Sequence, residues 1–194
     1  MEAKFIAVYE GETSKARKRR EREGWFEKYA PPNMSGIDLG CGPDPLNHTF
    51  RRWDSSYGEG DATILEGVPP NTFHTVYASH ILEHLQYPRQ GIARWYEVLR
   101  PEGHLIIIVP HRDLYEQKKE MPSAINPWHK TFWLPEEEDY PWTKSLKHEV
   151  LAAIPNANIV LLRVCDDGYK PGNMYNNHPE GEYSIELIVQ KPVY

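Results

Sequence analysis

Short apolar runs of strand length alternate along the chain with stretches in which apolar residues recur at helical spacing. The clearest helical stretch follows residue 80, where Ile92, Trp95, Tyr96 and Leu99 share one face until Pro101 ends the pattern. Two further helices are predicted, at 14–29 and, with a capping threonine, at 143–154. Strands are predicted at 36–39, 49–53, 62–65, 73–79, 104–110, 158–165 and 183–190.

This order predicts the α/β fold class, with an open and mostly parallel seven-stranded sheet in one domain spanning 1–194. The run 104–110 is apolar throughout, which is typical of a strand covered on both faces. No helix separates the last two strands, so the C-terminal strand is expected to run antiparallel to its neighbour. Residues 111–142 lack sustained periodicity and are predicted to form a lid-like insertion.

Composition narrows the classes of partner. The chain has 194 residues, 22 basic and 28 acidic, for a net charge of −6, which disfavours nucleic acid. The basic segment 14–29 is interpreted as a solvated helix, with a flap over an anionic ligand as the alternative. Cys41 and Cys165 imply no disulfide framework, the start of the chain lacks a secretion signal, and no apolar run could span a membrane, so a cytoplasmic location is expected.

The stretch GIDLGCGPDP, at 36–45, places an acid inside a predicted buried strand and two glycines directly after it. A buried carboxyl is costly unless it is hydrogen-bonded, and closely spaced glycines allow backbone to approach another body. In open α/β sheets, ligands bind beyond the carboxyl ends of the strands. The pattern therefore predicts a ligand site at this edge, together with His80 and His111, which also follow strand ends.

This stretch resembles the first motif of the class I S-adenosylmethionine-dependent methyltransferases, of the small Rossmann-like type 11 kind. The block YASHILEHLQYPRQGIARWYEVLRPEGHLIIIVP, at 77–110, is similar to the fourth-strand, helix and fifth-strand block of the same family. The resemblance implies a Rossmann-like three-layer sandwich and S-adenosylmethionine as the cofactor. A dinucleotide is disfavoured, because the third glycine of G-x-G-x-x-G is missing.

The resemblance also implies a set of cofactor-binding residues. The first-strand acid would organise the glycine loop, a second acid would accept the ribose hydroxyls, and a third would face the adenine amino group. The third acid has an equally simple interpretation as a turn aspartate. In chain order the set is Asp38, Gly40, Cys41, Gly42, Asp54, Asp61, Ala62, Ser79 and His80.

Transfer of a methyl group to an alcohol needs a group that removes the hydroxyl proton of the acceptor, and a histidine is suited to this role. The candidates are His129 first, then His111 and His80, all expected near the carboxyl edge of the sheet. No metal site is predicted, because no H-E-x-x-H motif occurs and HILEH would align its two histidines only if a helix began at once. Glu83 and His84 are interpreted as a structural acid and a packing histidine.

The sequence is therefore interpreted as a methyltransferase acting at oxygen or nitrogen of a small-molecule or sugar-like acceptor. The aromatic segment around NPWHKTF, which resembles an element of relatives in glycan pathways, favours the sugar-like acceptor. Two alternatives stay open: a catalytically silent binding module of the same fold, and an RNA methyltransferase using the basic segment. The sequence leaves the oligomeric state undetermined.

Overall fold

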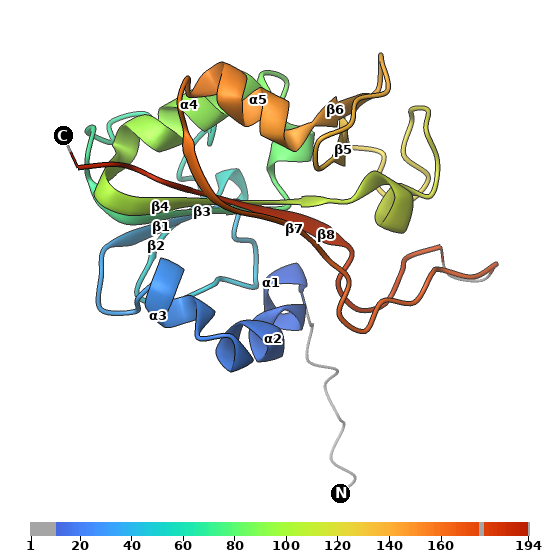
Figure 1. Ribbon diagram of the computed structural model, residues 1–194, viewed down its shortest axis with the longest axis horizontal. Coiled ribbons are helices and arrows are strands. Elements are labelled where there is room, and N and C mark those ends of the chain that lie inside the picture. The colour runs from blue at the N-terminus through green and yellow to red at the C-terminus, as the bar shows by residue number, and fades with distance from the viewer. Residues whose placement is uncertain (1–10, 175–176, 194) are drawn as a thin grey trace, which may run out of the picture.

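A six-stranded sheet forms the middle layer of the computed structural model, with helices on both faces (Figure 1). The structure describes residues 11–174 and 177–193, so the first ten residues, on which the prediction of no secretion signal rests, lie outside the described residues. The strands of this sheet are β1 (Gly36–Leu39), β2 (Arg51–Trp53), β3 (Phe73–Ser79), β4 (Leu99–Pro110), β7 (Asn158–Cys165) and β8 (Ser184–Gln190).

The sheet order is β2-β1-β3-β4-β8-β7. β2, β1, β3 and β4 pair in parallel, whereas β8 pairs antiparallel with both β4 and β7. The prediction of a mostly parallel sheet with an antiparallel C-terminal strand is therefore confirmed. The parallel strands direct their carboxyl ends to one edge, where the loops of the candidate site begin.

Alternate residues of the central strands pack into two separate cores. Val76 and Ala78 on β3 face the core beneath α4 (Pro88–Val98) and α5 (Leu146–Ala153), whereas Tyr77 faces the other core. The second core contains Trp25 and lies beneath α1 (Glu12–Lys15), α2 (Arg17–Arg22) and α3 (Trp25–Tyr29) (Figure 1). This alternation explains why β4 is apolar along its second half: both of its faces are covered.

The predicted strand at 62–65 is wrong, and its loss reduces the sheet from seven strands to six. The backbone turns there, and Leu65 has a left-handed φ of 46°. The guanidinium of Arg94 on α4 donates hydrogen bonds to the carbonyls of Ile64, Leu65 and Val68. These carbonyls therefore bond to a side chain, whereas a strand would pair them with a neighbouring strand.

The two outer predicted helices also differ from the structure. In place of one helix over 14–29, the chain forms α1, α2 and α3, and Gly24 with φ +64° separates α2 from α3. The helix predicted from Thr143 begins later: Thr143 opens β6 (Thr143–Ser145), and Ser145 caps α5 by accepting from the His148 amide at 3.1 Å. Ser145 is a better cap than Thr143 because it directly precedes the first turn of α5, so its hydroxyl can reach a free amide of that turn.

The segment 111–142 contains more regular structure than its sequence indicates. It includes the single-turn π-helix η3 (Arg112–Glu116) and β5 (Phe132–Leu134), which pairs in parallel with β6. Of its three tryptophans, Trp133 is fully buried in the main core, whereas Trp128 is 77% exposed. One end of the segment is thus anchored, and its role as a mobile lid stays a prediction.

Among the described residues, no helix is long and apolar enough to cross a membrane.

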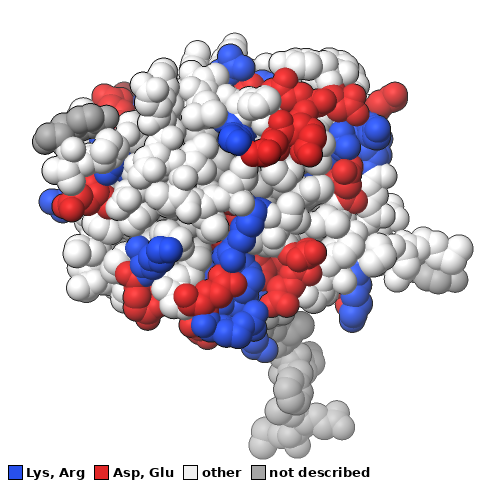
Figure 2. Space-filling model, viewed as in Figure 1, with Lys and Arg blue, Asp and Glu red and all other residues white. Residues whose placement is uncertain are grey.

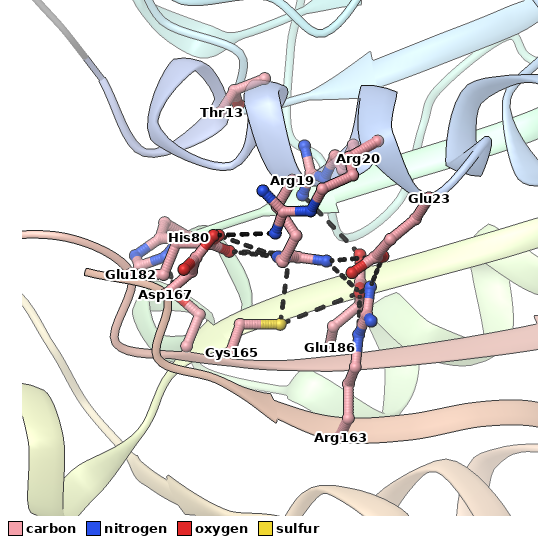
Figure 3. A network of polar contacts seen from close by, with 12 residues as sticks. Thr13, Arg19, Arg20, Glu23, His80, Arg163, Cys165, Asp167, Glu182 and Glu186 are labelled. Carbon is pink, nitrogen blue, oxygen red and sulfur yellow. Dashed lines mark hydrogen bonds and ion pairs between the residues drawn. The ribbon is translucent and has the colours of Figure 1, made fainter. Parts of the chain in front are cut away.

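A buried polar network fastens the N-terminal helices to the far end of the sheet (Figure 3). Arg19 on α2 pairs with Glu182 at 2.7 Å and lies 3.6 Å from Glu186 on β8. The Cys165 thiol accepts from Arg19 at 3.3 Å, and burial raises the pKa of this thiol to about 12. Arg20 is also buried and donates to the Tyr77 hydroxyl at 3.0 Å.

The basic segment is therefore largely neutralised by acids of the same chain. Figure 2 shows basic and acidic side chains intermixed over the N-terminal helices, and a separate acidic cluster near β5 and β6. Arg22 lies on the same helix as Arg19, but its pair with Asp167 is exposed. These two arginines allow the contribution of a buried ion pair to the free energy of unfolding to be compared with that of an exposed ion pair.

Arg19→Ala is expected to lower the free energy of unfolding by about 3–5 kcal/mol, because it leaves the buried Glu182 carboxylate without its cation. Arg22→Ala, the matched control, should change it by no more than about 1 kcal/mol, because exposed pairs contribute little. Urea unfolding followed by circular dichroism measures both. Equal losses in the two variants would contradict the assignment of the anchor to Arg19.

Candidate functional site

The loop after β1 brings the backbone into two left-handed turns. Gly40 has φ +65° and Gly42 has φ +49°, a conformation that favours glycine. A Cβ at Gly40 would lie 2.6 Å from the Ile81 side chain, whereas a Cβ at Gly42 would meet nothing within 4 Å. Gly40 is therefore required by Ile81 as well as by its φ, and open space for a close approach exists at Gly42.

Asp38 lies within β1 and is 1% exposed. Its carboxyl accepts from the Leu46 amide at 2.7 Å, which ties the end of the glycine loop back to the strand. Burial raises the pKa of Asp38 to about 7, against the opposing effect of the Leu46 hydrogen bond. The acid in the strand thus holds the loop 40–46 in place.

Asp54 follows β2 and connects two loops. One carboxylate oxygen accepts from the Gly42 amide at 2.9 Å, and the other accepts from the Ser56 amide at 2.8 Å. Burial raises the pKa of Asp54, but these backbone hydrogen bonds outweigh it and keep the pKa below its usual value. Asp54 is therefore a charged acceptor at neutral pH, and each oxygen retains a lone pair for a further donor.

A cavity of about 670 Å³ opens between these loops and the residues that follow β3. This volume lies within the usual range of small-molecule sites. It is lined by residues that the sequence singles out and by others that it does not: Gly40, Trp53, Asp54, Ser55, Ser56, Gly60, Asp61, Ala62, His80, Ile81, His84 and Leu85.

The cavity brings together five of the nine predicted cofactor residues: Gly40, Asp54, Asp61, Ala62 and His80. Asp61 also accepts from the amide of the residue two positions on, at 2.7 Å, which is the geometry of a turn aspartate. Both interpretations of this residue are therefore compatible with its position. The remaining four, Asp38, Cys41, Gly42 and Ser79, are not among the cavity-lining residues.

The two serines and the glycine of 55–60 escape prediction because they belong to a turn without apolar periodicity. The sequence does contain an indication of these residues. Asp54 directly follows β2, and residues that follow parallel strands lie at one edge of the sheet, where ligands bind. Ser55 and Ser56 form the short helix η1 (Ser55–Tyr57), which Asp54 caps through the Ser56 amide.

His80 follows β3 in a left-handed conformation with φ +53°, which is uncommon for a residue other than glycine. Its Nε2 lies 2.9 Å from the Ser184 hydroxyl, and its Nδ1 lies 3.7 Å from a carboxyl oxygen of Glu83. Burial lowers the pKa of His80 to about 4. The imidazole on the cavity wall is therefore uncharged at neutral pH.

His129, expected first among the histidines to contact an acceptor, is buried and does not line the cavity. Its Nδ1 lies 2.6 Å from Glu116, and its ring packs against His84, which does line the cavity. His111 lies apart: its Nδ1 accepts from the Asp113 amide and caps η3, and burial lowers its pKa.

Glu83, on the short helix η2 (Leu82–His84), lies at the centre of a histidine cluster formed by His80, His84 and His129. Its side chain is fully buried, and burial raises its pKa to about 8, with the nearby charge of Glu116 adding to the effect. One ligand atom from each of Glu83, His84 and His129 lies within 4.8 Å of the others. Sequence reasoning missed this cluster, because no spacing or motif connects 83–84 with residue 129.

Asp38 is expected to make folding stability depend on pH. Its pKa rises from 3.8 to about 7 on folding. Between these two pH values the folded chain therefore holds the Asp38 proton more tightly than the unfolded chain does. The stabilisation is fully present below about pH 4 and is lost as the pH rises through about 7.

Asp38→Asn keeps an oxygen for the Leu46 amide but has no titrating proton, so its stability should fall less over this range. Each unit by which the folded and unfolded pKa values differ corresponds to about 1.4 kcal/mol. Urea unfolding at a series of pH values measures the effect, with the exposed Asp166→Asn as control. Parallel curves for parent and Asp38→Asn would contradict the assignment.

Comparison with known proteins gives one family match. Residues 36–107, just over a third of the chain, match the model of the methyltransferase domain. No curated protein sequence matches the chain significantly.

Solved structures with the same fold cover almost the whole chain. A methyltransferase from Archaeoglobus fulgidus, described as S-adenosylmethionine-dependent, is 15% identical with a TM-score of 0.57, covering 93% of this chain and 95% of that one. The 1,6-didemethyltoxoflavin-N1-methyltransferase of Burkholderia thailandensis is 14% identical with a TM-score of 0.51, covering 95% and 80%. The [4+2]-cyclase SpnF is 13% identical with a TM-score of 0.55, covering 90% and 81%.

The match runs from β1 into β4, and this segment carries the glycine loop and every residue that lines the cavity. Residues 36–107 therefore match a methyltransferase domain, and the chain has the fold of the class I S-adenosylmethionine-dependent methyltransferases.

Proposed function

We propose that the protein transfers a methyl group from S-adenosylmethionine to oxygen or nitrogen of a small-molecule or sugar-like acceptor. The observation that carries this proposal is the cavity at the carboxyl ends of β1, β2 and β3, inside the matched segment. The family match implies S-adenosylmethionine as the cofactor. One neighbour of the same fold was solved with bound 1,6-didemethyltoxoflavin and S-adenosylhomocysteine, which supports a small-molecule acceptor.

The residues of the cavity fit this cofactor. Asp54 is a charged acceptor on the wall and matches the proposed ribose contact, and Asp61 matches the proposed adenine contact. Gly42 does not line the cavity, but its amide binds the cavity residue Asp54 and its backbone has open space beside it. Asp38 acts indirectly, by fixing the loop from beneath through the Leu46 amide.

When bound, S-adenosylmethionine supplies an electrophilic methyl group on a sulfonium. The chain's own contribution is positioning, which alone supplies about 7–11 kcal/mol when the reacting atoms are held in line. Among the three candidate histidines, His80 is the one on the cavity wall, so we place it first for contacting the acceptor. His111 and His129 do not line the cavity: His111 accepts from the Asp113 amide, and His129 lies beside Glu116.

The RNA alternative is weakened by the N-terminal helices. Arg19 and Arg20 are buried against Glu182, Glu186 and Tyr77, so they are withdrawn from any phosphate backbone. The silent-module alternative stays open, because the fold alone does not establish methyl transfer: SpnF shares it and is described as a cyclase. Cofactor binding without methyl transfer to any acceptor would favour that alternative.

Cofactor binding provides the first test. S-adenosylmethionine and S-adenosylhomocysteine should both stabilise the protein against heat, and calorimetry should give a defined affinity. Asp54→Asn should weaken binding about 10- to 150-fold, equivalent to about 1.5–3 kcal/mol for a charged hydrogen bond. Asp61→Asn tests the adenine contact, and the exposed Glu66→Gln is the control. Binding of NADH but of neither sulfur compound would overturn the proposal.

Methyl transfer provides the second test. Isotope-labelled S-adenosylmethionine is incubated with panels of sugars, phenols and amines, and labelled products are read by mass spectrometry. Once an acceptor is found, His80→Asn should reduce kcat about 10-fold, because it removes a polar contact to the acceptor, with little change in cofactor affinity. Asparagine tolerates the left-handed backbone at this position, which keeps the comparison fair. An unchanged kcat would remove His80 from the mechanism.

A further inference from the structure

The Glu83 carboxyl group is buried without the partners that such a group normally has. Its side chain is 0% exposed, and neither oxygen receives a hydrogen bond from another described residue. Among the residues that the structure describes, Glu186 is the other buried glutamate with an unbonded oxygen, but it faces the guanidinium groups of Arg19, Arg20 and Arg163. Glu83 has no such cation among its described neighbours, and a lone buried carboxyl is costly.

Three imidazole nitrogens lie near one Glu83 oxygen at distances too long for hydrogen bonds, and the nearest is His80 Nδ1 at 3.7 Å. The Nε2 atoms of His84 and His129 each lie 3.9 Å from the same carboxyl oxygen. A hydrogen bond requires about 3.5 Å or less, so the three groups do not bond directly to one another. The ligand atoms of Glu83, His84 and His129 nevertheless lie within 4.8 Å of one another, close enough for side-chain rotations to bring all three to one ion.

The other nitrogen of each ring is already engaged, which determines the chemistry of Nε2. His84 Nδ1 lies 3.2 Å from the Trp128 carbonyl, which can only accept, so this nitrogen carries the hydrogen. His129 Nδ1 lies 2.6 Å from the Glu116 carboxylate and carries the hydrogen for the same reason. Both Nε2 atoms therefore direct lone pairs toward Glu83. Metal-binding histidines typically donate their second N–H to a carboxylate or a backbone carbonyl in this way.

Backbone contacts hold the two contributing segments together. The Lys130 amide donates to the Glu83 carbonyl at 2.8 Å, which fixes the segment carrying His129 beside η2. The rings of His84 and His129 meet edge to face, with centroids 4.8 Å apart. The three side chains thus converge because of main-chain structure, from residues far apart in the sequence.

We propose that Glu83, His84 and His129 bind a divalent transition-metal ion, with Zn²⁺ as the best-matched ion. Two imidazoles and one carboxylate form a three-ligand set that leaves a fourth position open, as in catalytic zinc sites. Mg²⁺ and Ca²⁺ prefer sets built of oxygen. Zinc ligand atoms lie about 3.3 Å apart in tetrahedral geometry, so small side-chain rotations bring the observed atoms to bonding distance.

The ion lies at the wall of the cavity, because His84 lines the cavity. It also cross-links the segment 111–142, which carries His129, to η2. The ligand set is the group of Glu83, His84 and His129; His80 is not part of that group, although its Nδ1 lies 3.7 Å from the same Glu83 oxygen. The site is independent of methyl transfer, so failure of the proposed function leaves it intact.

Metal content and affinity test the site directly. Protein without an affinity tag is loaded with Zn²⁺, dialysed and analysed by mass spectrometry, and Zn²⁺ affinity is measured by competition with a chromophoric chelator. One ion per chain is expected. Glu83→Gln, His84→Ala and His129→Ala should each lose more than about 100-fold in affinity, and Glu116→Gln, which removes only the outer carboxylate, about 10- to 100-fold.

The control is His48→Ala, which removes an exposed histidine distant in sequence from the cluster and should bind Zn²⁺ as the parent does. Sub-stoichiometric zinc in the parent would overturn the proposal. Equal losses in His48→Ala and the three ligand variants would also overturn it, because they would indicate unspecific chelation by surface histidines.

Thermal stability separates metal binding from a merely structural role. In EDTA, Glu83→Leu should be at least as stable as the parent, because it removes an unpartnered buried carboxyl. In excess Zn²⁺ the order should reverse, because only the parent gains stability from the ion. A Glu83→Leu variant that is less stable in EDTA, or a parent that Zn²⁺ does not stabilise, would contradict the proposal.

Discussion

The parallel pairing of β1, β2, β3 and β4 is the constraint on which the remaining structure depends. It sends four consecutive strand ends to one edge of the sheet, so that each following loop starts within reach of the others. Asp54, His80 and His111 each follow one of these ends. The cavity and the histidine cluster are both consequences of this single geometric fact.

Polar groups at this edge are arranged in two different ways. In the first, around Asp38 and Asp54, each carboxylate binds backbone amides and so fixes the loops that shape the cavity. In the second, around Glu83, the carboxyl is left without such donors while imidazole lone pairs face it. Asp38 and Asp54 therefore stabilise the loops of the chain, whereas the Glu83 carboxyl is available to bind a ligand.

The parts of the fold that depend on local sequence could be predicted, and those that depend on distant contacts could not. The glycine loop, β3 and β4 follow from short patterns whose physical cause lies in the same residues. The turn at 62–65 depends on Arg94, about thirty residues later, which captures its carbonyls. The meeting of Glu83 with His129 likewise depends on a backbone hydrogen bond between segments that no periodicity connects.

The position of β8 has a consequence for synthesis on the ribosome. β8 lies between β4 and β7 in the sheet, and its Ile188 completes the core beneath the N-terminal helices. Trp25 and Ile106 belong to the same core but precede β8 by many residues, so they emerge long before the strand that helps to cover them. The nascent chain must carry this apolar face until β8 has been made, and during that period the uncovered surface favours aggregation.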